Sequence, residues 1–189
     1  MAKQVAKIYG EALFDLAMEQ NKPDAYLEEV LGIGKILEEN PEFDKLMKHP
    51  KISKAEKQEI VGNVFSGSVS KEMTGFLKLV VSKERYRDIN SIFSYFVDRV
   101  KEEKKIGVAY VTTAIPLSAG KKAEVEQKLL QTTPYKKMEM HYSVDEDIIG
   151  GMIIRIKDRV VDSSVRTKLL EMKKQLSQIQ LGELIERKV

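Results

Sequence analysis

The spacing of apolar residues changes once along the chain, and this change constrains the fold more than any other feature. Up to residue 105, apolar residues recur every three or four positions, as on one face of an amphipathic helix. From Ile106 onward, short segments alternate apolar and polar residues, which is typical of half-buried strands. The charged segment Lys101–Lys105 separates the two patterns. We therefore predict an α+β chain of two domains, residues 1–105 and 106–189.

The first domain is predicted to be an N-terminal six-helix bundle with short loops. Pro23 and Pro41 suit first helical turns, Pro50 ends a helix, and Ser53 with Glu56 forms a capping box. The domain holds 18 basic and 18 acidic side chains, so it is neutral overall. Apolar residues at helical spacing mark the successive helices: Leu13 and Leu16, Leu27 and Val30, Phe43 and Met47, Ile60 and Val64, Phe76 and Val80, Ile92 and Phe96.

The second domain is predicted to be a small α/β C-terminal domain. We expect strands at residues 106–114, 138–144, 148–156 and 159–161, and a helix from Ser118 to about residue 131 between the first two. Gly150 and Gly151 fall inside the third predicted strand, where glycine permits a bulge or a close backbone approach. Asp162 and Ser163 are the predicted cap of a final helix.

The final helix carries apolar residues spaced alternately four and three positions apart. That spacing is a coiled-coil seam, narrower than the face of a helix in a globular domain. We expect its first half to cover the sheet and Leu176 and Ile179 to face a partner. The seam consists of Val165, Leu169, Met172, Leu176 and Ile179.

Composition excludes several classes of protein. The chain has no Cys, so disulfides, thiolate zinc sites and cysteine nucleophiles are excluded. Its net charge of +3 is too mild for nucleic-acid binding through phosphate neutralisation. No apolar run approaches the roughly 20 residues that span a bilayer. Met1–Val5 leads directly into a helical pattern without a signal peptide, so we expect a cytosolic protein.

Candidate chemical groups all have a structural explanation. Gly150-Gly151 lacks the Gly-Lys-Ser/Thr ending of a phosphate-binding loop. Asp145–Asp147 lies in a predicted turn without the glycine spacing of a calcium loop, and Asp158 and Asp162 suit a turn and a cap. We predict no catalytic residue, no metal ion and no cofactor. Two alternatives stay open: an enzyme, which needs titratable groups in contact, and a helical or RNA-associated adaptor, which needs salt-dependent nucleic-acid affinity.

Several short motifs, weak alone, are specific in their order and spacing. Together they resemble the delta subunit of bacterial F-type ATP synthase, which is related to the mitochondrial oligomycin-sensitivity-conferring protein. The resemblance covers about residues 1–181, with Gly10 where the family usually has Ala and Ser163 where Gly is frequent. The motifs are Tyr9–Phe14, His49–Ile52, Lys83–Arg85, Ile89–Phe96, Thr113–Ser118, Val144-Asp145, Ile149–Gly151 and Asp158–Arg166.

The resemblance implies a non-catalytic connector that couples proton flow to ATP synthesis. The first domain would hold an alpha-subunit N-terminal helix between its first and fifth helices, and the second would bind the stalk's b subunits through Leu176 and Ile179. It also implies one copy in a hetero-oligomer, peripheral to the cytoplasmic face of the bacterial plasma membrane, without nucleic acid. The implied groove residues are Tyr9, Leu13, Leu16, Ala17, Phe76, Leu79, Val80 and Lys83.

Overall fold

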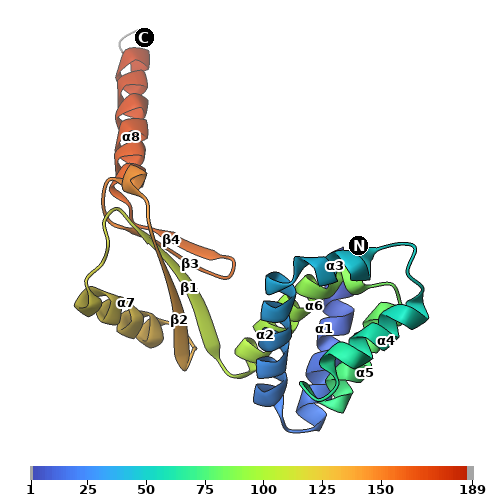
Figure 1. Ribbon diagram of the computed structural model, residues 1–189. Helices are drawn as coiled ribbons and strands as arrows, with labels where there is room; N and C mark the ends of the chain where they lie inside the picture. Colours follow the sequence, from blue (N-terminus) through green and yellow to red (C-terminus); the bar gives the residue numbers. More distant parts are fainter. Residues whose placement is uncertain (1, 187–189) are drawn as a thin grey trace. The chain divides into compact units, whose positions relative to one another are not determined.

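The computed structural model describes the backbone of residues 2–186 and the side chains of residues 3–177, and it confirms the α+β class (Figure 1). The chain divides into two compact units, Met1–Glu103 and Lys104–Val189. The division falls within the charged segment between the helical and the alternating sequence patterns. Each unit buries apolar side chains of its own.

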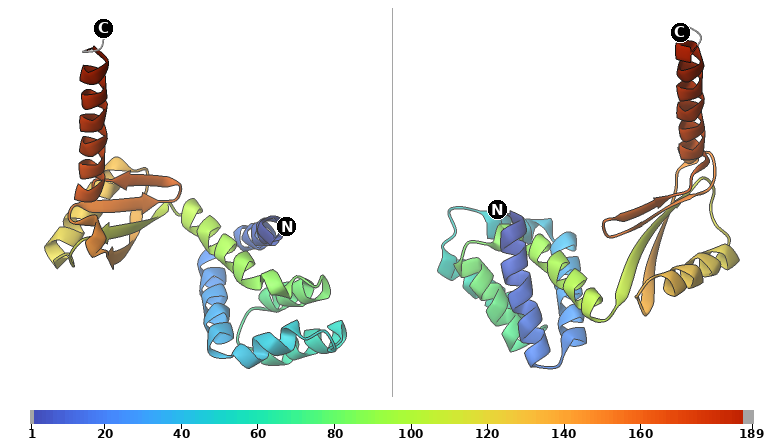
Figure 2. Two further views of the ribbon diagram at one scale, coloured as in Figure 1. Left: turned by 90° about the horizontal axis from the view of Figure 1, so that it is seen from above. Right: turned by 180° about the vertical axis from the view of Figure 1, so that it is seen from behind.

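The described part of the N-terminal unit is helical. Helices α1 and α6 pack against each other, as do α4 and α5, and α2 also contacts α6 (Figures 1 and 2). The elements are α1 (Ala2–Glu19), α2 (Pro23–Glu39), α3 (Pro41–Lys48), α4 (Lys54–Phe65), α5 (Lys71–Ser82), the 3₁₀ helix η1 (Tyr86–Asp88) and α6 (Ile89–Glu103).

Side-chain caps fix where two of these helices begin. The predicted capping box of α4 is confirmed: Ser53 Oγ accepts from the Glu56 amide at 3.3 Å, and Glu56 Oε2 accepts from the Ser53 amide at 2.9 Å. The hydrogen bond from the Ser53 amide lowers the pKa of Glu56. Ser70 caps α5 and also donates from its amide and its hydroxyl to the Glu29 carboxylate, both at 2.9 Å. The start of α5 is therefore tied to α2.

One hydrophobic core joins all six α-helices of the unit. Fully burying a large apolar side chain contributes roughly 1.5–3 kcal/mol, so the many buried residues outweigh the caps in stabilising the unit. Phe43 and Phe65 add an edge-to-face contact, with ring centroids 6.0 Å apart. The largest fully buried side chains include Leu13, Tyr26, Ile33, Met47, Met73, Ile92 and Phe96.

The C-terminal unit contains a four-stranded sheet in the order β2-β1-β3-β4. Strand β1 (Ile106–Thr113) pairs in parallel with β2 (Lys137–Val144) and antiparallel with β3 (Met152–Ile156), which pairs antiparallel with β4 (Arg159–Asp162). Helix α7 (Ala119–Thr132) provides the crossover that two parallel neighbours require. It packs beside β2 (Figure 1). Met138 of β2 is buried, as are Ala109 and Val111 of the neighbouring β1.

The predicted start of the third strand was wrong. Residues Glu146–Ile148 form the 3₁₀ helix η2 instead, and β3 begins only at Met152. The cause is local: Asp145 Oδ1 accepts from the Asp147 amide at 3.0 Å, which turns the chain before the apolar run can extend. Gly150 and Gly151 therefore precede the strand rather than lying within it.

Candidate functional site

Four of the eight predicted groove residues lie in the core of the N-terminal unit. Leu13 and Ala17 of α1 and Val80 of α5 are fully buried, and Phe76 is 7% exposed. The surfaces of these side chains are already occupied by the unit's own packing. They fix α1 and α5 in place, and in this conformation they leave contact with another chain to residues nearer the surface.

The other four predicted groove residues reach the surface. Tyr9 and Leu16 on α1 are half-buried at the edge of the core, while Leu79 on α5 is 47% exposed and Lys83, directly after α5, is exposed. Ile8 is a further exposed apolar residue of α1. Leu79 and Lys83 lie one helical turn apart, an apolar residue followed by a cation, which suits an amphipathic helix with acidic flanks.

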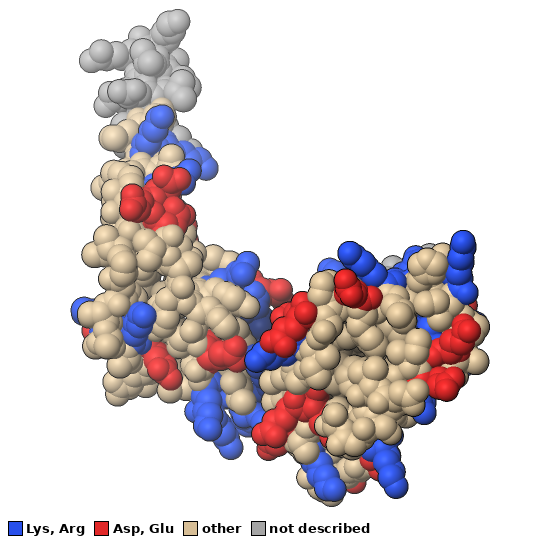
Figure 3. Space-filling model, in the orientation of Figure 1, with Lys and Arg blue, Asp and Glu red and all other residues tan. Residues whose placement is uncertain are grey.

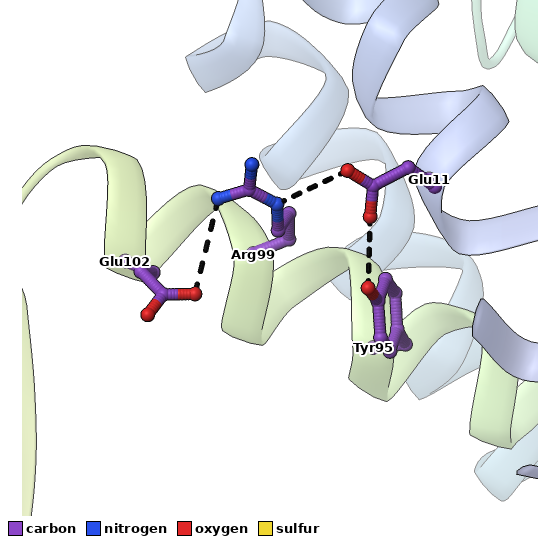
Figure 4. A network of polar contacts seen from close by, with 4 residues as sticks. All are labelled: Glu11, Tyr95, Arg99 and Glu102. Atoms are coloured by element: carbon purple, nitrogen blue, oxygen red, sulfur yellow. Dashed lines mark hydrogen bonds and ion pairs between the residues drawn. The ribbon is translucent and has the colours of Figure 1, made fainter.

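A polar network joins α1 to α6 (Figure 4). Tyr95 donates to Glu11 Oε2 at 2.8 Å, and Arg99 Nε donates to Glu11 Oε1 at 3.3 Å. The Tyr95 hydrogen bond, followed by Arg99, lowers the pKa of Glu11. Arg99 also pairs with Glu102 at 3.8 Å and lies over the Phe14 ring at 4.7 Å from its centroid. The carboxylate is held ionised between two donors, so the network orients helices rather than transferring a proton.

Gly10 permits the close approach of these two helices. A Cβ atom at Gly10 would lie 2.5 Å from Cδ1 of the Tyr95 ring and 3.2 Å from the Ile92 carbonyl oxygen. The sequence analysis identified this glycine only as a departure from the Ala that the resembled family usually has. The residues around Gly10 in the sequence carried no signal of this contact, because Tyr95 belongs to a helix much later in the chain.

The described histidines and carboxylates form no metal-binding cluster. No group of three His, Asp or Glu side chains in the described part of the chain could hold a metal ion. His49 Nδ1 accepts from the Lys51 amide at 3.2 Å, and His141 stacks on Tyr110 with ring centroids 5.0 Å apart. Basic and acidic side chains are interspersed on the face of both units seen in Figure 3.

Gly151 is explained by close packing of the backbone. Its φ is +76°, and a Cβ atom there would lie 2.4 Å from the Ser163 carbonyl oxygen. The Ser163 amide donates to Met152 O at 3.0 Å, and the Val165 amide donates to Gly150 O at 2.9 Å. The predicted close approach is therefore confirmed. These two hydrogen bonds hold the chain at the start of β3 against the chain that leads into α8.

Helix α8 (Val165–Glu186) leaves its described apolar side chains in solvent. Asp162 turns the chain into it: Oδ1 accepts from the Ser164 amide at 2.9 Å and Oδ2 from Thr167 Oγ1 at 2.8 Å, which lowers the pKa of Asp162. The expectation that Val165–Met172 covers the sheet was wrong, because the helix contacts the unit mainly at η2. Leu176 is 63% exposed, and the Ile179 side chain lies outside the described residues.

A groove that the sequence did not predict lies between α7 and the β3–β4 hairpin. Its volume is about 730 Å³. Its β3 and β4 walls were assigned to a sheet that the final helix was expected to cover, so their exposure was missed. The walls include Leu129, Tyr135, Ile154, Ile156 and Val161, and charged residues at its edge are Lys128, Lys157, Asp158 and Arg159.

Comparison with known proteins decides between the connector, the enzyme and the adaptor hypotheses. The family model for the ATP synthase delta (OSCP) subunit matches residues 5–176. The chain belongs to this family. It is 51% identical over 182 residues to ATP synthase subunit delta of Lachnoclostridium phytofermentans, an alignment that covers 96% of this chain and 100% of that protein. It is 36% identical over 169 residues to the delta subunit of Brevibacillus brevis, covering 89% and 96% of the two chains.

A solved structure has the same fold at low identity. A chain of the Toxoplasma gondii mitochondrial ATP synthase hexamer superposes with a TM-score of 0.72 and 17% identity, covering 90% of this chain and 96% of that one. As a member of the delta (OSCP) family, the chain is a non-catalytic subunit of F-type ATP synthase and a component of its stator, the peripheral stalk. None of the described helices is long and apolar enough to span a membrane.

Proposed function

We propose that this stator subunit connects an alpha-subunit N-terminal segment to the b subunits of the peripheral stalk, as one copy in the complex at the cytoplasmic face of the bacterial plasma membrane. The N-terminal unit acts as a six-helix bundle that binds the catalytic head, and the C-terminal unit binds the stalk. The observation that carries this proposal is that each unit exposes apolar side chains on a helix, Leu79 on α5 and Leu176 on α8.

The alpha-subunit contact is assigned to the surface of α1 and α5. Tyr9, Leu16 and Leu79 supply apolar area, and Lys83 supplies a charge at the edge that orients an amphipathic helix. Leu13, Ala17, Phe76 and Val80 support these residues from the core beneath. Apolar anchors backed by rigid core packing lose little conformational freedom on binding, which favours affinity.

A charge placed at Leu79 tests this contact. We expect Leu79→Asp in the full chain to weaken binding of an alpha-subunit N-terminal peptide by about tenfold or more, because a carboxylate is poorly solvated against an apolar helix. Val64→Asp on α4 is the matched control, since Val64 is 45% exposed and lies outside this surface. Calorimetric titration measures both variants, and equal affinities would remove Leu79 from the contact.

The b-subunit contact is assigned to the seam of α8. Residues 165, 169, 172 and 176 fall on one side of the helix, whereas Leu170, 59% exposed, points about 100° away from Leu169 around the axis. A narrow stripe on an otherwise unpacked helix suits pairing with another helix. Of the two predicted partner residues, Leu176 lies on this stripe, and Ile179 follows it three positions later in the sequence.

Leu170 provides an internal control for the stalk contact. We expect Leu176→Asp to reduce capture of purified b subunits by about tenfold, and Leu170→Asp to leave capture unchanged, because only the first lies on the seam. Binding of the alpha-subunit peptide should stay the same in both variants. Equal loss of b-subunit capture in both variants, or no loss in either, would place the stalk contact elsewhere. The groove between α7 and the β3–β4 hairpin would then be the next surface to test.

A further inference from the structure

A concave surface of the N-terminal unit carries a surplus of positive charge. It is a pocket of about 560 Å³ where the end of α3, the following loop, the start of α4 and the α5–η1 turn meet. Two carboxylates also line it, Glu84 and Asp88. The unit as a whole is neutral, so this surplus is a local concentration. We call it the basic pocket, and its cations are Lys48, Lys54, Lys57, Arg85 and Arg87.

Ion pairs account for only part of this charge. Lys54 Nζ lies 3.0 Å from Glu84 Oε1, and Lys48 pairs with Asp44. Lys57, Arg85 and Arg87 make no ion pair with any residue that the structure describes. Three cations are therefore available to a ligand. The hydrogen bond from Lys54 lowers the pKa of Glu84, and the charges of Lys57 and Arg85 act in the same direction.

The turn that carries the two arginines is held by a strained residue. Glu84 has a φ of +58°, a left-handed conformation that glycine adopts at much lower cost. Its amide donates to Val81 O at 3.0 Å and the Arg85 amide donates to Val80 O at 2.9 Å, which closes the C-terminus of α5. A glutamate at this position keeps the ion pair to Lys54. The ion pair therefore links this strained turn to the start of α4, and both segments form walls of the pocket.

The walls of the basic pocket also include apolar side chains. Met47, Ile52 and Val81 line it together with the cations. A half-enclosed cavity of this volume is in the usual range for small-molecule sites and is several times larger than one phosphate ion. The site therefore suits a ligand with a compact multiple charge and a less polar part.

We propose that the basic pocket binds a small molecule bearing two or more linked phosphate groups. The phosphates lie against Lys57, Arg85 and Arg87, and any less polar part lies against Met47, Ile52 and Val81. Arginine guanidinium groups present paired donors that match phosphate oxygens. The three cations without ion pairs outnumber Asp88, the one carboxylate of the pocket that has no ion pair among the described residues, so the surplus of positive charge attracts a diphosphate. The concavity favours such a ligand over an acidic protein surface, which would meet a flatter patch.

Titration calorimetry with the full chain tests this proposal with ADP, pyrophosphate and inorganic phosphate as probes. We expect saturable binding of ADP and pyrophosphate that weakens as salt is added, and much weaker binding of inorganic phosphate. Tighter binding of ADP than of pyrophosphate identifies a nucleotide as the source of the phosphates, and equal binding identifies an inorganic diphosphate. Absence of saturable binding of both probes up to about 1 mM overturns the proposal.

A double substitution locates the binding. Lys57→Gln with Arg85→Gln should weaken diphosphate affinity by about tenfold or more, since each removes a charge-assisted contact. Lys22→Gln with Lys71→Gln is the matched control, because it removes the same charge from exposed lysines of the same unit outside the pocket. Equal loss in both double variants would show only general attraction and would overturn the site.

Amide chemical shifts provide a readout that does not depend on variants. Addition of pyrophosphate to ¹⁵N-labelled chain should shift the amides of residues 48–57 and 84–88, which surround the pocket. Shifts confined to other segments would overturn the proposal. Binding of an acidic peptide without any binding of the two diphosphates would also overturn it and would make this surface a protein contact.

Discussion

Replacing Gly151 by Ala combines two costs at one position of the C-terminal unit. The backbone there has a φ of +76°, which costs a residue with a Cβ atom about 1–2 kcal/mol. The new Cβ would also lie 2.4 Å from Ser163 O and 3.1 Å from Ser164 Cα, both backbone atoms. Relieving such overpacking costs about 1–3 kcal/mol, so we expect Gly151→Ala to lower the free energy of unfolding by about 2–5 kcal/mol.

The measurement must report on the C-terminal unit alone, because a chain of two units need not unfold in one transition. Hydrogen exchange of the β1 amides, which lie at the centre of the sheet, gives that local free energy. Gly120→Ala is the control: Gly120 lies in α7 with open space around it, and the change should stabilise the unit by up to about 1 kcal/mol. If Gly151→Ala changed the exchange free energy by less than about 0.5 kcal/mol, the argument from backbone contact would be refuted.

Two predictions concern the N-terminal unit. The Tyr86 hydroxyl is buried without a hydrogen-bond partner among the described residues, and burial raises its pKa. Tyr86→Phe should therefore raise the free energy of unfolding, measured in urea, by about 1 kcal/mol. A decrease of that size would instead reveal a hydrogen-bond partner of the hydroxyl. The pKa of Glu11 is lowered by folding, so the stability that it contributes is complete above its unfolded pKa near 4.5 and is lost as pH falls through the folded value. Glu11→Gln should flatten the acid side of the curve of unfolding free energy against pH, and an unchanged curve would show that the Tyr95 and Arg99 contacts are not maintained in solution.

Local signals explain why much of the fold could be predicted from the sequence. The Ser53–Glu56 capping box and the prolines that begin α2 and α3 act within a few residues, so their effect is visible in a short segment. The start of β3 was missed because the Asp145 turn competed with an apolar run that alone favours a strand. Periodicity records which side of an element is apolar and not where a side-chain hydrogen bond interrupts it.

The candidate site was less predictable because burial is a tertiary property. Leu13 and Val80 have the same helical spacing as the exposed Leu79 and Ile8, so the pattern could not separate core residues from surface residues. The first half of the α8 seam was wrongly assigned to the sheet, because the sequence spacing does not say which surface an apolar stripe meets. The contact of Gly10 with Tyr95 and the basic pocket both join segments far apart in the chain, which a single sequence cannot bring together.

The position of β1 has a mechanical consequence for a stator subunit, which transmits force between other components. Tension that reaches the C-terminal unit through Lys104-Lys105 acts on the first residue of β1, a central strand bonded to β2 along Ile106–Thr113 and to β3 along Ala109–Thr113. That strand can leave only if both ladders shear. Tension arriving through α8 acts on β4, an edge strand with one neighbour, which can peel away bond by bond. Under load the unit should therefore yield at its C-terminal side first, and the rupture force should depend on the direction of pulling.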